Sequence, residues 1–276
     1  MPIRCDAAAL SAAESDARSR DARSPDRLAT SPHPSAMDRR AFLRLGGYAG
    51  LAGLCWGLLP AHFADAAGPV YCNPNRPTTP ADAMAALMAG NGLWATGNQQ
   101  HPGEDTTRRD CVAQNDQTPF AAILSCADSR VPPALIFDQG LGDLFVVRVA
   151  GNSNTAVGQQ SLTYGVNKLH ALALLVLGHQ GCGAVSTAVT SFPRPAPTFV
   201  SLIYPAVRKA RLIVQQGGGN PDDPTQVIPV AIEQHALMTA AQLSARTPFK
   251  DLIRNGSLIV AAGVYSLDNQ AVTILT

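Results

Sequence analysis

The amino-acid sequence predicts an α/β fold in which a mostly parallel central sheet is flanked by helices. Three short runs, FAAILSC (120–126), LFVVRVA (144–150) and ALALLVLGH (171–179), have the near-continuous apolar character of strands covered on both faces. Between the second and third runs, apolar residues recur at helical spacing over 157–169. Strands that alternate with helices in this way are typical of a parallel sheet.

The remaining elements follow from local signals along the chain. Thr79 and Pro80 are typical of a helix start, and apolar residues on one face continue the pattern beyond them. The segment 98–117 is polar and aperiodic, so we expect a loop or surface segment there. Two further helical segments are expected at 195–216 and 225–245. A closing strand pair at 257–266 and 271–276 would form an antiparallel edge of the sheet.

The N-terminal part divides into two segments before a single domain at 67–276. Residues 1–36 contain few large apolar side chains and are expected to be disordered, and translation is predicted to start at Met37. Residues 37–66 resemble a twin-arginine export signal, with Arg39 and Arg40 near its start and Ala64-Asp65-Ala66 as the cleavage site. We therefore expect a periplasmic or otherwise exported protein.

A membrane anchor is the alternative for the same segment, because residues 45–64 form an uncharged stretch long enough to span a bilayer. The glycines in this stretch, Pro60 and the cleavage site favour the signal, so no stable anchor is expected after cleavage. The formal net charge is only +1, which provides no positive field for nucleic acid. Nucleic acid is therefore not an expected partner.

Export determines which cysteines remain in the mature chain. These would be Cys72, Cys111, Cys126 and Cys182. An oxidising compartment permits a disulfide between Cys72 and Cys111, and two unrelated thiols are an equally open interpretation.

Three potential metal ligands lie at the ends of two predicted strands. Cys126 ends the first apolar run, and His179 and Cys182 follow the third. The carboxyl ends of parallel strands are where ligands gather in open α/β sheets. Two thiolates and an imidazole suit Zn²⁺ with one position left over, as catalytic zinc sites require. From the residues alone, two buried structural cysteines and a hydrogen-bonded histidine remain the alternative.

Asp128 and Arg130 favour the catalytic interpretation. They stand two residues apart in an extended segment, so their side chains project to the same side and can form a charge-assisted pair near Cys126. A solvated turn would not need a preceding buried strand that ends in cysteine.

With these residues in place, the chain resembles a β-class carbonic anhydrase. Cys126-Ala127-Asp128-Ser129-Arg130 matches that family's Cys-x-Asp-x-Arg motif, and His179-Gln180-Gly181-Cys182-Gly183 matches its His-x-x-Cys-Gly motif. The similarity extends over roughly 79–276. The resemblance implies one zinc ion per subunit, held by Cys126, His179 and Cys182, and active sites formed where two subunits meet in a homodimer or tetramer.

The resemblance also implies a substrate pocket for carbon dioxide and bicarbonate. Gln117 stands where the family has a pocket glutamine, Phe145 and Tyr164 where it has apolar walls, and Gly183 where a main-chain N–H contacts substrate. The chain departs from the family pattern at Thr163 and Gly165, beside this tyrosine, and at Ala150, where a larger wall residue is usual. Ile123 replaces the tryptophan of the bicarbonate-inhibited subgroup, which favours a form with Asp128 off the metal.

The function implied is the reversible hydration of carbon dioxide to bicarbonate and a proton, by zinc-bound hydroxide that the Asp128–Arg130 pair orients. Two alternatives stay open. One is a hydrolase of carbon disulfide or carbonyl sulfide on the same scaffold, for which the smaller Ala150 wall is the feature to watch. The other is a non-catalytic periplasmic zinc-binding protein, which would need neither Asp128 nor Arg130. His101 and His170 are candidates for proton transfer by residue type only.

Overall fold

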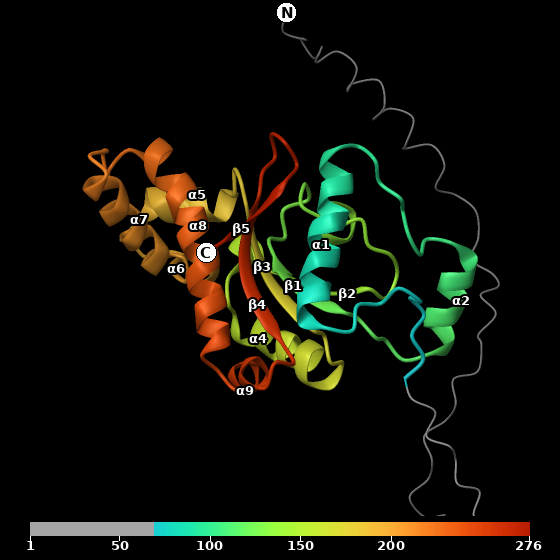
Figure 1. Cartoon of the computed structure of the whole chain (residues 1–276). Coiled ribbons are helices and arrows are strands. Elements are labelled where there is room, and N and C mark those ends of the chain that lie inside the picture. The colour runs from blue at the N-terminus through green and yellow to red at the C-terminus, as the bar shows by residue number, and fades with distance from the viewer. Residues whose placement is uncertain (1–68) are drawn as a thin grey trace, which may run out of the picture. The chain divides into compact units, whose positions relative to one another are not determined.

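A computed structural model describes residues 69–276, and the predictions made for 1–68 lie outside this range. Its centre is a five-stranded sheet of order β2-β1-β3-β4-β5 (Figure 1). Neighbouring strands are parallel except for β5, which runs antiparallel to β4. The strands are β1 (Ala121–Ser125), β2 (Leu144–Arg148), β3 (Ala173–His179), β4 (Ile259–Tyr265) and β5 (Val272–Leu275). The predicted parallel core with an antiparallel terminal edge is therefore confirmed.

Strands β1 and β3 form the centre of the core. Every residue of both strands is buried, which explains their near-continuous apolar sequence. Alternate side chains point to opposite faces of the sheet. Ala122, Leu124, Leu174 and Val176 belong to the core on one face, whereas Ile123 and Leu175 belong to the core on the other.

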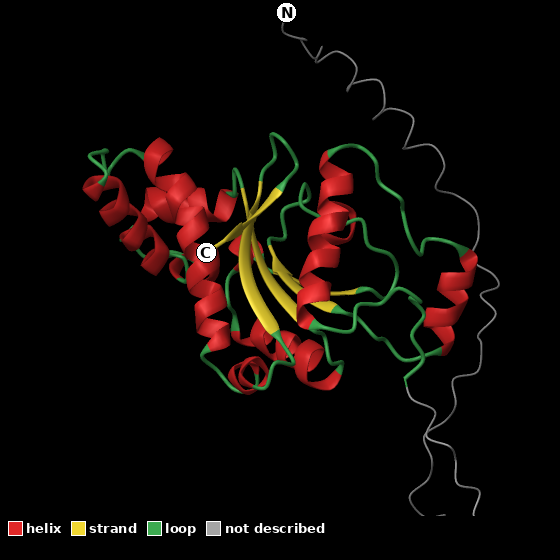
Figure 2. Cartoon of the chain, viewed as in Figure 1, coloured by secondary structure: helices red, strands yellow, loops and turns green. Residues whose placement is uncertain are grey.

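Helices cover both faces of this sheet (Figure 2). Helix α1 (Pro80–Ala95) packs against β3 and β4 from one side, and the long helix α8 (Pro224–Ser244) packs against the same strands from the other. The remaining elements are α2 (Thr106–Gln114), α3 (Pro133–Ile136), η3 (Ala150–Asn152), α4 (Ala156–Thr163), η4 (Tyr164–Lys168), α5 (Gly183–Ser191), α6 (Thr198–Ser201), α7 (Tyr204–Gln216) and α9 (Phe249–Arg254).

Helix α1 starts where the sequence predicts. The Thr79 hydroxyl accepts a hydrogen bond from the Asp82 N–H, and Pro80 occupies the first helical turn. Further along the helix, the buried Asn91 side chain donates to the carbonyls of Ile136 and Gln270. Asn91 thus ties α1 to the turn between β4 and β5.

The segment 98–117, expected to be a loop or a surface segment, lies at the surface over α2 but is helical there rather than a loop. This helix has almost no apolar periodicity to reveal it, because its stability comes from elsewhere. Asp105 caps its first turn by accepting from the Arg108 N–H at 2.9 Å. The Arg108 guanidinium forms a buried ion pair with Asp143, at 3.1 Å between Nη1 and Oδ1. A partner distant in sequence therefore holds the helix, which is why local pattern does not predict it.

A disulfide joins Cys72 to Cys111 of α2, so the first of the two interpretations of these cysteines is confirmed. It attaches the segment before α1 to the rest of the domain, and a hydrogen bond from Asn73 Nδ2 to Asp143 Oδ1 supports the same attachment. Within residues 69–276, no helix has the length and apolar character needed to cross a membrane.

Reduction of the disulfide is expected to destabilise the protein. The bond closes a loop with a sequence separation of 39 residues. Loop-closure entropy assigns such a bond about 4 kcal/mol, as the free energy of unfolding lost on reduction. Urea unfolding at one fixed protein concentration, with and without reductant, measures this difference. The Cys72→Ser/Cys111→Ser variant serves as the control, since reductant should leave its unfolding midpoint unchanged. Equal midpoints for the oxidised and reduced wild-type protein would contradict the expectation.

Candidate metal centre

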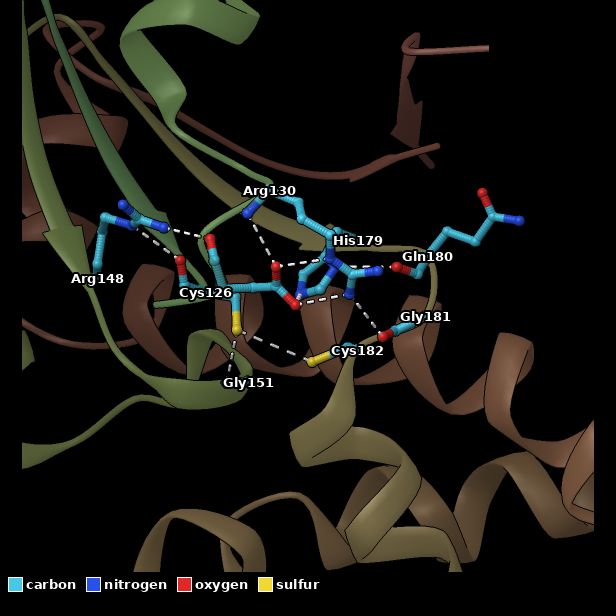
Figure 3. A network of polar contacts seen from close by, with 9 residues as sticks. Cys126, Arg130, Arg148, Gly151, His179, Gln180, Gly181 and Cys182 are labelled. Carbon is cyan, nitrogen blue, oxygen red and sulfur yellow. Dashed lines mark hydrogen bonds and ion pairs between the residues drawn. The ribbon is translucent and has the colours of Figure 1, made fainter. Parts of the chain in front are cut away.

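Two thiols and an imidazole meet at the carboxyl ends of β1 and β3 (Figure 3). The ligand atoms of Cys126, His179 and Cys182 all lie within 4.8 Å of one another, and the two sulfurs are 4.0 Å apart. All three residues are buried. The cluster forms because β1 and β3 are direct neighbours in parallel register, with Ser125 opposite Leu177. The predicted ligands are therefore brought together.

The ring of His179 is oriented for metal binding. Its Nδ1 lies 2.9 Å from the Gln180 carbonyl oxygen. A carbonyl oxygen can only accept a hydrogen bond, so Nδ1 carries the proton and Nε2 has a free lone pair. Nε2 is buried and has no hydrogen-bond partner in residues 69–276. A buried imidazole nitrogen directed at two thiols is the arrangement expected of a metal ligand.

The two sulfurs interact strongly with each other. The hydrogen bond with Cys182 is the main cause that lowers the pKa of Cys126. The same interaction, followed by burial, raises the pKa of Cys182. Two thiolates at this distance repel each other in a buried site, so a bound cation is needed before both can ionise. Two sulfurs and one nitrogen are a ligand set that zinc prefers.

Main-chain N–H groups supply further stabilisation of negative charge on sulfur. The Gly151 N–H donates to Cys126 Sγ at 3.2 Å. Gly151 has a φ of 67°, and an added Cβ would lie 2.8 Å from Ile203 Cδ1, so a larger residue would be strained in its backbone and would require the Ile203 side chain to move. Cys182 precedes the first turn of α5, whose Ala184 and Val185 N–H groups lower its pKa in opposition to the larger effects.

Asp128 and Arg130 form the predicted pair beside this cluster. Arg130 Nε donates to Asp128 Oδ1 at 2.9 Å, and Arg130 Nη2 donates to Oδ2 at 2.8 Å. The Arg130 N–H also donates to Oδ1, at 3.0 Å. These hydrogen bonds, the side-chain ones first, hold the pKa of the Asp128 carboxyl well below its usual range. Asp128 Oδ2 lies 3.9 Å from His179 Nε2, so an ionised carboxylate faces the metal ligands.

Arg148 supports the site through contacts that the sequence analysis missed. It ends β2 opposite Ser125, and its side chain reaches across to the loop that follows β1 (Figure 3). Its Nε donates to the Cys126 carbonyl at 3.0 Å, and its Nη2 donates to the Asp128 carbonyl. Arg148 therefore holds the backbone that carries both a metal ligand and the carboxylate. The sequence signal that could have identified Arg148 is its position as a charged residue at the end of an otherwise apolar strand.

Three of the four predicted pocket residues lie away from the cluster within one chain. Gln117 and Tyr164 line a cavity of about 510 Å³ that does not include the metal ligands. Phe145 is 6.2 Å from Tyr164 between ring centroids. Phe145 pairs with Ala122, three residues before the end of the strand, and thus roughly 10 Å from the carboxyl edge of the sheet. Gly183, in contrast, starts α5 directly beside Cys182.

The structure accounts for one departure from the family pattern. An added Cβ at Gly165 would lie 2.8 Å from Phe145 Cδ1, so the Phe145 ring would have to move for an alanine to fit. Of the two histidines considered for proton transfer, His170 lines the cavity with Gln117 and Tyr164. His101 instead lies 3.4 Å from Glu104 in an exposed pair.

Comparisons with known proteins agree with this centre. The family model described as carbonic anhydrase matches residues 121–272. Carbonic anhydrase 2 of Mycobacterium tuberculosis is 35% identical over 195 residues, which cover 70% of this chain and 91% of the relative. The solved β-carbonic anhydrase of Coccomyxa, in complex with acetazolamide, is 28% identical with a TM-score of 0.53, covering 70% and 86% of the two chains.

A third likeness concerns the fold alone. The tetrameric β-carbonic anhydrases of the ascomycete Sordaria macrospora share 20% identity at a TM-score of 0.53, over 70% of this chain and 97% of theirs. The family match spans more than half of the chain, and it contains all three metal ligands and the Asp128–Arg130 pair. On these grounds the chain belongs to the carbonic anhydrase family, in its β class.

Proposed function

We propose that this enzyme hydrates carbon dioxide reversibly to bicarbonate and a proton, with Asp128 and Arg130 positioning the attacking oxygen. The observation that carries the proposal is the ionised Asp128 carboxylate, held on Arg130 and 3.9 Å from the His179 nitrogen that is free for metal. Zinc storage alone would need neither side chain.

Cys126, His179 and Cys182 would hold one zinc ion per chain, since their buried sulfur and nitrogen atoms lie within 4.8 Å of one another. Bound zinc supplies a nucleophile at neutral pH by lowering the pKa of water, to about 7 in the three-histidine carbonic anhydrase that exemplifies the effect. Three protein ligands leave a fourth position open for this chemistry.

Asp128 is proposed to accept a hydrogen bond from the attacking oxygen. Its Oδ1 already receives two hydrogen bonds from Arg130, whereas Oδ2 receives one and faces His179. The free lone pair of Oδ2 can therefore orient the O–H so that the oxygen's lone pair points at carbon dioxide. The adjacent guanidinium keeps the carboxylate ionised and attached to Arg130 rather than to the metal.

The substrate pocket is proposed to form between two copies of the chain. Within one chain, the cavity that Gln117 and Tyr164 line does not include the metal ligands, Phe145 lies beside Tyr164, and Tyr164 is 47% exposed. In a homodimer or tetramer, these residues would complete the site of the neighbouring copy. Gly183 belongs to the chain that holds the metal, and an added Cβ there would meet no atom within 4 Å. Its N–H would stabilise the developing bicarbonate oxygens.

We further propose that the enzyme acts in the periplasm. The twin-arginine pattern at Arg39 and Arg40 supports this location. The disulfide between Cys72 and Cys111 supports it independently, because disulfides persist in oxidising compartments.

The substitution Asp128→Asn is expected to reduce carbon dioxide hydration at neutral pH by about 100-fold, because the amide presents a donor or a neutral acceptor where a charged acceptor orients the oxygen. Zinc content should stay at about one ion per chain. A stopped-flow assay measures the rate of carbon dioxide hydration, and a metal analysis of the same sample measures the zinc content per chain.

Asp222→Asn is the matched control, since Asp222 pairs with Arg211 on the surface at 3.3 Å and lies in the turn between α7 and α8, outside the strand ends that carry the metal ligands. Near-normal turnover of Asp128→Asn would exclude the proposed role of Asp128.

Turnover measured with carbonyl sulfide and carbon disulfide tests the alternative hydrolase, which would turn these substrates over faster than carbon dioxide.

Bicarbonate is expected to inhibit without cooperativity. Ile123 is fully buried in β1 and its side chain fills the apolar core, so the tryptophan of the bicarbonate-inhibited subgroup is absent. Inhibition of carbon dioxide hydration, measured against bicarbonate concentration, should follow a hyperbolic curve. A sigmoidal curve would contradict the assignment.

A further inference from the structure

The Gln180 side chain is fully engaged with a turn far away in sequence. Its Oε1 accepts hydrogen bonds from the Leu267 N–H at 2.9 Å, the Ser266 hydroxyl at 3.2 Å and the Asp268 N–H at 3.3 Å. Its Nε2 donates to Asp268 Oδ2 at 2.6 Å. One amide thus connects the loop between two metal ligands to the turn that joins β4 and β5.

The main chain of the same residue faces the metal centre. The Gln180 carbonyl accepts from His179 Nδ1 at 2.9 Å, and its N–H donates to the Tyr265 carbonyl at 2.9 Å. Figure 3 shows the Gln180 side chain directed away from the two sulfurs, while its carbonyl is joined to His179. The two peptide groups that flank the Gln180 Cα are therefore each held by a hydrogen bond, which restricts the backbone of this residue.

The turn is itself a firm anchor. The buried Asn91 of α1 donates to the Gln270 carbonyl and accepts from the Val272 N–H at 2.7 Å. Leu267 lies over Gly181, where an added Cβ would be 3.7 Å from Leu267 Cδ1. The turn thus packs against the loop that carries the ligands, and the core of the domain holds it there.

We propose that Gln180 is a positioning residue for the zinc ligand His179. By fastening the loop to the turn at Ser266–Asp268, its side chain keeps the Gln180 carbonyl where it accepts from Nδ1. This contact holds the imidazole tautomer and ring direction, so Nε2 stays directed at the zinc position. The proposal extends the metal centre to the terminal hairpin, and it rests on the proposed zinc site rather than on the reaction.

The first test measures zinc release in Gln180→Ala. The full-length zinc protein is mixed with an excess of a colorimetric chelator, and the rate of zinc transfer is recorded. Loss of a partner behind a metal ligand typically weakens metal binding by 10-fold or more, so we expect release to be about 10-fold faster than in the wild type. The absorption spectrum of the Co²⁺-substituted protein should also shift, because the imidazole is less well oriented.

A paired exchange separates positioning from general disruption. Gln180→Glu keeps an acceptor for the turn but sets a second carboxylate against Asp268, so it should also release zinc faster. Adding Asp268→Asn restores a donor on the opposite side of the same contact. We expect Gln180→Glu/Asp268→Asn to return the release rate to within about twofold of the wild type.

Asn269→Ala is the matched control, because it removes a hydrogen bond inside the same turn, from the Ala271 N–H at 3.1 Å, without touching Gln180. Its release rate and Co²⁺ spectrum should equal those of the wild type. The proposal is overturned if Gln180→Ala releases zinc at the wild-type rate. It is equally overturned if the exchange variant releases zinc as fast as Gln180→Glu. Neither measurement involves carbon dioxide, so failure of the proposed catalytic function would be recognised separately.

Discussion

The pairing of β1 with β3 is the constraint on which the metal centre depends. Parallel neighbours end at the same edge of a sheet, so the residues that follow Ser125 and Leu177 must meet there. Cys126 directly follows β1. His179 is the last residue of β3, and Cys182 ends the short loop between β3 and α5. A shift of one residue in this register would turn every side chain of a strand to the opposite face. The buried apolar residues of both strands therefore also determine the geometry of the ligands.

Burial makes this cluster chemically demanding. Two thiols that share one site cannot both ionise without a cation, and a buried imidazole nitrogen without a partner is costly. The fold meets these demands with main-chain donors from Gly151 and the start of α5, and with zinc as the cation that the family uses. Two hydrogen bonds from the Arg130 guanidinium stabilise the negative charge of Asp128 beside the cluster. The buried thiols and imidazole, whose burial is energetically unfavourable, are also the groups that bind the metal.

The residues that the sequence predicts for the active site lie in two separate regions of the chain. The metal ligands and Gly183 lie at the carboxyl edge of the sheet, whereas Gln117 and Tyr164 line a cavity elsewhere. In the proposed assembly, each chain would contribute its metal centre to one pocket and its apolar wall to another. Subunit contact would then be part of the active site, so activity and association would be lost together.

Local sequence was sufficient for the apolar strands, the Thr79 cap, the ligand types and the Asp128–Arg130 pair, because adjacent residues or a simple periodicity define each of them. It was insufficient for α2, whose stability comes from the Arg108–Asp143 ion pair and a disulfide. Arg148 and Gln180 escaped prediction for the same reason, since their partners lie 22 and 88 residues away at the Cys126 carbonyl and Asp268. The sequence by itself determined which chemistry this protein can perform. Only the tertiary structure decided how the ligands are aimed, because hydrogen bonds between distant segments depend on the packing that brings those segments together.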